Sequence, residues 1–261
     1  MFESLYQQAD LFSKNSKSYV EPLSKNKIKL IRSLRLKKNR DSEGLFMIEG
    51  EKMVLEILRE NEDIIEFICT SESTAIFNRI YHTDERGMKE ISNLATPPSL
   101  IAIVRKTETN VSTGNFILAL DGIQDPGNLG SILRTAKATN TKSIIMSKTC
   151  ADLWSPKTLR GSQGVQFTLE CFDEQNLNEW ILNYEHDVIA LATNGESLFK
   201  KNLNLNMAIL VGNEGNGISK SLLKNIVGTI SLPMHKEVES INVGAAVSAF
   251  MYEHYRQSHV D

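Results

Sequence analysis

Residues 120–134 read LDGIQDPGNLGSILR and are the most informative stretch of the sequence. It predicts a buried strand that ends near Leu120, a tight turn at Asp125-Pro126-Gly127, and a helix with Asn128 as its N-cap. At about 100° per residue, Arg134 points nearly opposite the apolar residues of this helix. Arg134 can therefore reach a ligand, although a lone arginine on a helix is more often a solvated surface side chain.

Strands and helices alternate beyond residue 116. Short, nearly continuous apolar runs predict the strands, and apolar residues at helical spacing predict the helices. We expect strands at 116–120, 143–146, 188–192, 207–211 and 229–232, a further candidate at 167–171, and helices at 128–139, 176–184, 219–227 and 242–255. This alternation predicts a mostly parallel sheet with helices on both faces, which binds ligands beyond the carboxyl ends of its strands.

The N-terminal part of the chain predicts a smaller α/β module. Residues 1–25 are a polar arm, and residues 26–106 form the module. Within it we expect helices at 28–34 and 52–61 and strands at 45–50, 64–70 and 101–104. The polar stretch 107–115 is the expected linker, and residues 116–261 form the second domain.

A run of basic residues near the N-terminus is the main electrostatic feature, because the whole chain carries a net charge of only −3. The run contains no acidic residue before Asp41. Its members are Lys25, Lys27, Lys29, Arg32, Arg35, Lys37, Lys38 and Arg40. Such a run can neutralise RNA phosphates and release counterions, although a solvated helix face is the alternative. We favour RNA contact because acids are excluded while the rest of the chain is acidic.

Composition sets the broad class of protein. A chain of 261 residues with 41% hydrophobic content can form one large domain or two ordinary ones. No apolar run approaches the ~20 residues that span a bilayer, and the N-terminus lacks the apolar core of a signal peptide, so we expect a cytoplasmic protein. Cys69, Cys150 and Cys171 form no Cys-x-x-Cys pair, which argues against disulfides and a cysteine zinc site.

Residues 209–219 read ILVGNEGNGIS and predict a glycine-rich loop between a strand and a helix. Gly212, Gly215 and Gly217 allow the backbone to approach a ligand closely, although such loops also serve simply as turns. The spacing matches neither the dinucleotide nor the triphosphate fingerprint. Glu214 is either a solvated carboxylate or a partner in an active site.

A third segment begins with the strand at 229–232, which Pro233 terminates. Asn242 stands at the start of the last helix, where it can cap the helix, contact a ligand, or do both. The apolar stripe that follows repeats at helical spacing and is more typical of a core or subunit interface than of a cofactor site.

In their order and spacing, these three segments resemble the motifs of the SpoU/TrmH family of RNA ribose 2′-O-methyltransferases. The family pattern Asn-x-Gly-x-x-x-Arg is matched by Asn128, Gly130 and Arg134. Residues 160–164, RGSQG, resemble a further family element, although Val165 replaces its usual alanine. Ile241 and Gly244 also depart from the commonest residues of the third motif.

The resemblance implies the α/β-knot fold of the SPOUT superfamily: a mostly parallel sheet with a C-terminal trefoil knot, preceded by a small RNA-binding α/β domain. It implies a homodimer, S-adenosylmethionine as cofactor and no metal. It assigns catalytic roles to Asn128, Arg134 and Glu214. It places the cofactor at Gly212, Asn213, Gly217, Ile230, Leu232, Met234, Ser240, Asn242 and Val243.

The implied reaction is attack of an RNA ribose 2′-hydroxyl on the cofactor methyl group. Because a guanidinium is a poor base, we expect Arg134 to clamp a phosphate and stabilise the developing alkoxide, with the proton passing to phosphate or water. His235 is more typical of a loop residue than of the base. The two-domain form favours 23S-type rRNA as substrate; a tRNA methyltransferase and a noncatalytic RNA-binding homologue are the alternatives.

Overall fold

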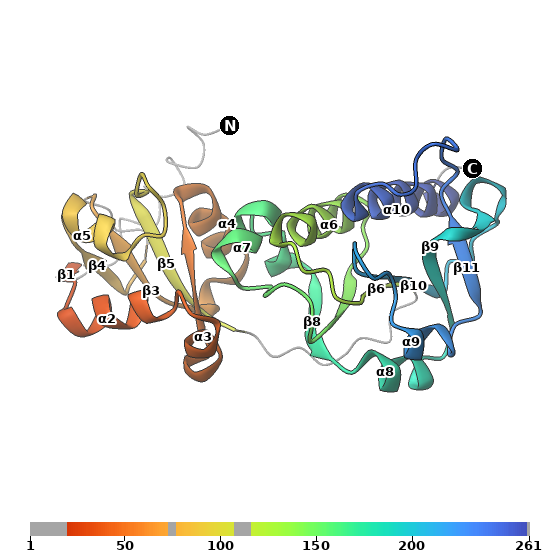
Figure 1. The fold of residues 1–261 in the computed structure, drawn as a ribbon. Coiled ribbons are helices and arrows are strands. Elements are labelled where there is room, and N and C mark those ends of the chain that lie inside the picture. The colour runs from red at the N-terminus through yellow and green to blue at the C-terminus, as the bar shows by residue number, and fades with distance from the viewer. Residues whose placement is uncertain (1–19, 73–76, 107–115, 260–261) are drawn as a thin grey trace. The chain divides into compact units, whose positions relative to one another are not determined.

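The computed structural model describes residues 20–72, 77–106 and 116–259 (Figure 1). The expected linker at 107–115 and most of the expected arm at 1–25 lie outside these residues. Contacts divide the chain into two compact units, Met1–Thr107 and Glu108–Asp261. In the described residues, no helix is both long and apolar enough to cross a membrane.

The first unit is built on a five-stranded mixed sheet with the order β1-β4-β3-β5-β2. Its apolar core packs α2 and α5 against one face of this sheet, with Ile31 and Met88 fully buried. The elements are β1 (Val20–Pro22), α2 (Lys25–Ser33), α3 (Lys37–Glu43), β2 (Leu45–Glu49), α4 (Glu51–Asn61), η1 (Glu62–Ile64), β3 (Ile65–Thr70), β4 (Ile80–His82), α5 (Glu85–Ile91) and β5 (Leu100–Arg105).

The second unit is built on a six-stranded sheet with the order β11-β9-β10-β6-β7-β8, in which every pair of neighbours is parallel. The elements are β6 (Phe116–Leu120), α6 (Pro126–Ala138), β7 (Ser143–Ser147), α7 (Pro156–Ser162), η2 (Val165–Thr168), β8 (Glu170–Gln175), α8 (Leu177–Asn183), β9 (Asp187–Ser197), η3 (Leu198–Lys200), β10 (Met207–Val211), α9 (Lys220–Leu223), β11 (Gly228–Ser231) and α10 (Val243–His259). The predicted parallel α/β class is therefore correct.

Helices cover both faces of this sheet. Figure 1 shows α6, α7 and α10 along one face and α8 and α9 along the other. On the second face, alternate strand residues such as Ile117 and Leu210 form one apolar cluster with Leu177 of α8 and Leu222 of α9. The strand order places the end of β6 beside the end of β10, so the first two sequence motifs meet at one edge.

Three local predictions need correction. Asp125, not Asn128, is the N-cap of α6, because its carboxylate accepts from the Asn128 backbone N–H. Residues 165–168 form a 3-10 helix, so β8 begins only at Glu170. The helix expected at 219–227 is the short α9: of its residues only Leu222 is buried, so a longer helix would have no apolar face to pack.

Candidate functional site

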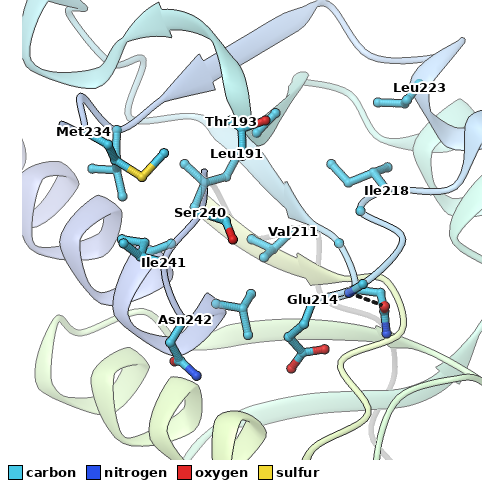
Figure 2. Close-up of a pocket in the computed structure, with 18 residues that line it drawn as sticks. Leu191, Thr193, Val211, Glu214, Ile218, Leu223, Met234, Ser240, Ile241 and Asn242 are labelled. Atoms are coloured by element: carbon cyan, nitrogen blue, oxygen red, sulfur yellow. Dashed lines mark hydrogen bonds between the residues drawn. The ribbon is translucent and has the colours of Figure 1, made fainter. Parts of the chain in front are cut away.

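A cavity of about 640 Å³ opens beyond the carboxyl ends of β10 and β11 and beside the middle of β9 (Figure 2). It lies where ligands bind in parallel sheets. Its lining combines apolar side chains with amides, hydroxyls and one carboxylate. The lining residues are Leu191, Ala192, Thr193, Val211, Gly212, Asn213, Glu214, Gly215, Gly217, Ile218, Leu223, Leu232, Met234, Ser240, Ile241, Asn242, Val243 and Ala246.

Three polar side chains from three distant segments form a chain of hydrogen bonds beside this cavity. Asn128 Nδ2 donates to Glu214 Oε1 at 2.7 Å, and Asn242 Nδ2 donates to Asn128 Oδ1 at 2.9 Å. Asn242 Oδ1 also accepts from the Ala245 backbone N–H at 3.3 Å, so Asn242 caps α10 and contacts Asn128 together. The network fixes the orientation of each amide and leaves Glu214 exposed toward the cavity.

Asn128 is available for this network because Asp125 caps the helix in its place. The Asp125 carboxylate accepts from the Asn128 N–H at 2.8 Å, and Pro126 occupies the first turn, where a missing N–H costs nothing. The side chain of Asn128 is then not needed by its own helix. The sequence pattern predicted Asn128 as the cap, whereas Asp125 holds that position.

The glycine-rich loop is organised by Asn213. Its backbone exchanges two hydrogen bonds with Gly217, at 3.0 and 2.9 Å, and its Oδ1 accepts from the N–H groups of Gly215 and Asn216. Its Nδ2 donates to the Gly122 carbonyl at 2.8 Å. Asn213 lines the cavity, but both ends of its side chain are used to shape the loop.

A further link between the first two motifs involves Asp121, which was not among the expected site residues. Asp121 is buried, and its Oδ2 accepts from the backbone N–H of Ser219 at 2.9 Å and from the Ser219 hydroxyl. The link joins the end of β6 to the end of the glycine-rich loop. An aspartate directly after a buried strand was the only signal in the sequence.

The structure brings together all but one of the residues expected at the cofactor. Ile230 is fully buried in β11 and does not line the cavity, because this position of the strand faces the core. Leu191, Ala192 and Thr193 form a wall of the cavity that was not expected from the sequence. Leu191 and Ala192 end the strand predicted at 188–192 and Thr193 follows it, so the carboxyl-end rule could have found them.

Arg134 lies on α6, exposed, and does not line the cavity. Within the described part of the chain, its side chain has no hydrogen bond or ion pair with another residue. Its guanidinium is therefore available to a molecule that approaches α6 from solvent.

The basic run of the first unit is not uniformly available. Arg40 is buried, and its guanidinium donates to the Leu34 carbonyl at 2.6 Å and the Arg35 carbonyl at 2.9 Å, so it braces the turn between α2 and α3. This corrects its expected contact with RNA. Arg32 pairs with Glu90 at 2.9 Å.

Other members of the run also have partners in the first unit. Arg35 donates to two backbone carbonyls, and Lys37 pairs with Asp41 at 2.8 Å. Lys27 lies over the rings of Phe67 and Tyr81, at 4.6 and 4.2 Å from their centroids. The lysines Lys25, Lys29 and Lys38 are exposed.

None of the three cysteines lines the cavity. Burial raises the pKa of the Cys69 thiol to about 12 and also raises the pKa values of Cys150 and Cys171, so these thiols stay protonated at neutral pH. In the residues that the structure describes, no group of three His, Cys, Asp or Glu side chains could hold a metal ion.

Comparisons with known proteins agree along both units. The SpoU rRNA Methylase family matches residues 115–252, and the MRM3-like substrate binding domain matches residues 25–102. A 23S rRNA (guanosine(2553)-2′-O)-methyltransferase of Bacillus subtilis, RlmP, is 28% identical over 89% of this chain and 97% of its own length.

Solved structures give the same result. An RNA methyltransferase of the TrmH family from Porphyromonas gingivalis has a TM-score of 0.80 and 30% identity, covering 88% of this chain and 97% of its own. An AdoMet-bound rRNA methyltransferase from Sinorhizobium meliloti has a TM-score of 0.81 at 24% identity, covering 93% of this chain and 98% of its own, which shows a common fold.

Proposed function

The chain belongs to the SpoU rRNA methylase family, and from this premise we propose that it transfers a methyl group from S-adenosylmethionine to a ribose 2′-hydroxyl of 23S-type ribosomal RNA. The observation that carries the proposal is the hydrogen-bonded chain of Asn242, Asn128 and Glu214. It joins the three motifs beside a cavity at the carboxyl edge of a parallel sheet.

The residues present fit this cofactor. A cavity of about 640 Å³ is of the size that holds a nucleoside-sized ligand. Apolar side chains such as Leu191, Ile218 and Val243 suit an adenine ring, while hydroxyls, amides and the Glu214 carboxylate suit the polar, charged end. When bound, S-adenosylmethionine supplies an electrophilic methyl group on a sulfonium.

Arg134 is the residue we assign to the RNA. Its exposed guanidinium offers five N–H donors in a planar fork, which matches a phosphate at two points. Held there, the same group favours negative charge that develops on a neighbouring ribose oxygen. A guanidinium does not readily accept a proton, so the hydroxyl proton passes to phosphate or water.

The amide network is assigned to positioning. With Asn128 fixed between Glu214 and Asn242, its own rotation is restricted by two hydrogen bonds of 2.7 and 2.9 Å. Alignment of the attacking oxygen with the methyl group supplies much of the rate in a displacement of this kind, because effective molarities of about 10⁵ M or more are attainable. Glu214 keeps its second oxygen available at the cavity.

Several features support rRNA as the substrate. The chain aligns with RlmP over nearly its full length, across both units. The first unit matches a substrate-binding domain and carries the basic run. Arg40 does not count among its phosphate contacts, because it is buried. We propose that Lys25, Lys29 and Lys38, which are exposed, supply its contacts with phosphates.

We also propose a homodimer, a cytoplasmic location and the knot, all of which the family implies. In support of the homodimer, the large apolar side chains of Phe199, Ile241 and Tyr252 are exposed on the second unit. Sedimentation equilibrium measures the subunit number directly. A monomer at micromolar concentration would contradict this part of the proposal.

The test is transfer of radiolabelled methyl from S-adenosylmethionine to separated rRNA and tRNA pools from unmodified sources, with Arg134→Ala as control. We expect label in 23S rRNA that survives alkali as a 2′-O-methylated dinucleotide and is absent with the control. Label in tRNA alone would overturn the substrate assignment. An absence of label in both pools, with cofactor binding confirmed by calorimetry, would overturn the activity and favour a noncatalytic RNA-binding protein.

A further inference from the structure

In the second unit, a basic segment of the sequence is followed by an acidic one. Between residues 126 and 169 there are six basic residues and a single acid, Asp152. The basic residues are Arg134, Lys137, Lys142, Lys148, Lys157 and Arg160. Residues 170–187 show the reverse, with six acids and no lysine or arginine. The acids are Glu170, Asp173, Glu174, Glu179, Glu185 and Asp187.

The fold turns this division into two faces. The basic segment contains α6 and α7, which lie along one face of the sheet, and the acidic segment contains α8, which lies along the other (Figure 1). Leu177 and Ile181 of α8 are buried in the apolar cluster of that second face. Glu170, Asp173 and Glu174 lie in β8 itself, whereas Glu179 lies on α8, on the other side of the sheet from α6 and α7.

The basic side chains are free to meet a partner. All six are exposed, and within the described residues none forms an ion pair or a side-chain hydrogen bond. Basic residues elsewhere in the described chain do form ion pairs, as in Arg79–Glu66 and Lys201–Glu196. Exposed cations left without counterions by the protein itself are the footprint of a phosphate-binding surface.

Three of these residues lie toward the catalytic end of the face. Lys148 follows β7 at the carboxyl edge of the sheet, and Lys157 lies in the first turn of α7. Arg160 directly precedes Gly161. A Cβ on Gly161 would lie 3.4 Å from the Pro126 carbonyl oxygen, so this part of α7 packs on the first turn of α6, which carries Asn128.

We infer that Lys148, Lys157 and Arg160 form, with Arg134, a phosphate-binding face over α6 and α7 that holds the RNA strand on either side of the methylated nucleotide. The inference rests on the proposed function and extends it. The acidic face over α8 repels RNA, so the charge division sets which side of the second unit the RNA approaches. The basic run of the first unit is a separate contact.

The test compares two double variants of the full-length protein. Lys157→Gln/Arg160→Gln removes two charges from this face, and Lys220→Gln/Lys224→Gln removes two exposed charges at α9, on the opposite face. RNA affinity is measured with protein-free 23S rRNA transcript between about 50 and 200 mM salt. Cofactor affinity and the melting temperature are measured for each variant.

We expect the α7 variant to lose about tenfold to hundredfold in RNA affinity, and the slope of log affinity against log salt to become shallower by about 2. Adding Lys148→Gln should lower the slope by about 1 more. The α9 variant should match wild type, and cofactor affinity should be unchanged in all.

Equal salt slopes for the α7 and α9 variants would overturn the inference, even if the wild type methylates rRNA as proposed. If the wild type transfers no methyl group but the α7 variant alone loses RNA binding, the surface stands and the proposed activity fails. A loss of cofactor affinity or a lower melting temperature in the α7 variant would also contradict the inference, because it would indicate a structural role.

Discussion

Asp121 and Ser219 are 98 positions apart, yet a single carboxylate oxygen of Asp121 accepts from both the backbone N–H and the hydroxyl of Ser219. Asp121 directly follows β6, and Ser219 closes the loop that lines the cavity. A carboxylate in a buried position needs such donors to offset its loss of water. The pair therefore couples the stability of the sheet edge to the shape of the cofactor loop.

Removing the Ser219 hydroxyl should weaken cofactor binding. Ser219→Ala leaves the buried Asp121 carboxylate with one donor fewer, which we expect to cost about 1–3 kcal/mol of stability. Ser219→Thr keeps the hydroxyl and should restore both stability and affinity. Calorimetric titration with S-adenosylmethionine and thermal melting measure the two effects. Wild-type cofactor affinity in the alanine variant would show that the pair does not position the loop.

Asn128 should be more sensitive to charge than to size. In Asn128→Asp a carboxylate would face Glu214 Oε1, which now accepts at 2.7 Å, and two like charges at that distance repel. We expect methyl transfer to fall about 10²-fold, as for a misplacement of about 1 Å.

Repulsion between the new carboxylate and Glu214 should make the activity of Asn128→Asp depend on pH. Because like charges raise the pKa of one carboxyl, the variant should bind a proton there more readily, and its activity relative to wild type should recover as the pH falls toward about 6. Asn128→Ala is the control, since it loses the same hydrogen bonds without adding a charge. The same relative pH profile in both variants would exclude the electrostatic explanation.

The sequence predicted the site's location better than its internal contacts. Apolar runs identified five of the six strands of the parallel sheet and placed β8 three residues too early, and the carboxyl-end rule then located the three motifs together. Residue type alone does not distinguish Asp125 from Asn128 as the N-cap of α6, since both residue types are good caps. The contacts of Asn128 with Glu214 and Asn242 span 86 and 114 positions, and no local pattern reports them.

Two expected site residues have buried side chains for a related reason. Arg40 and Ile230 occur where their neighbours in sequence suggest exposure or cofactor contact, but packing buries both. Burial of Arg40 depends on how α3 folds back on α2, and α3 has no apolar stripe to predict it. Such features follow from tertiary packing and are not visible in residue spacing.

Arg134→Lys tests whether a planar two-point contact is required. A lysine keeps the charge but presents a single point donor, whereas a guanidinium offers a planar fork. We expect kcat to fall about 10²-fold or more, as when a positioned donor to developing charge is lost. RNA affinity should change little, because one charge remains. Near-normal kcat in the lysine variant would exclude the bidentate clamp and leave a purely electrostatic role.

His254 should make stability depend on pH. It is buried and stacks on Phe116 with ring centroids 3.9 Å apart, and burial lowers the pKa of His254 from 6.5 to about 4, with a smaller effect of His259. The unfolded chain binds this proton more readily, so the stability contribution is complete above about pH 6.5 and is lost as the pH falls toward 4. We expect a loss of about 2 kcal/mol between pH 7 and 5.

Urea unfolding at each pH gives this quantity, and His254→Phe is the comparison because phenylalanine can stack but not titrate. The variant should show no corresponding loss in this window. Hydrogen bonds from Arg256 lower the pKa of Glu253 from 4.5 to about 2. Glu253 therefore changes the stability only below about pH 4.5, outside this window. Parallel stability curves for wild type and variant between pH 7 and 5 would contradict the assignment to His254.

Gly130→Ala decides between two opposing effects on α6. Alanine favours a helix over glycine by about 1 kcal/mol. However, a Cβ on Gly130 would lie 2.6 Å from the Gly161 carbonyl carbon and 2.8 Å from its Cα, and these are backbone atoms that cannot simply rotate away. Overpacking of this kind costs about 1–3 kcal/mol, so we expect a net loss of stability.

Gly228→Ala is the matched control, because its Cβ would meet no atom within 4 Å. Thermal melting should show a lower midpoint for Gly130→Ala and little change for Gly228→Ala. Because α6 carries both Asn128 and Arg134, methyl transfer should fall with the Gly130 substitution as well. A midpoint at or above that of wild type would mean that α7 can move away from α6 at little cost, and that their contact does not fix the catalytic helix.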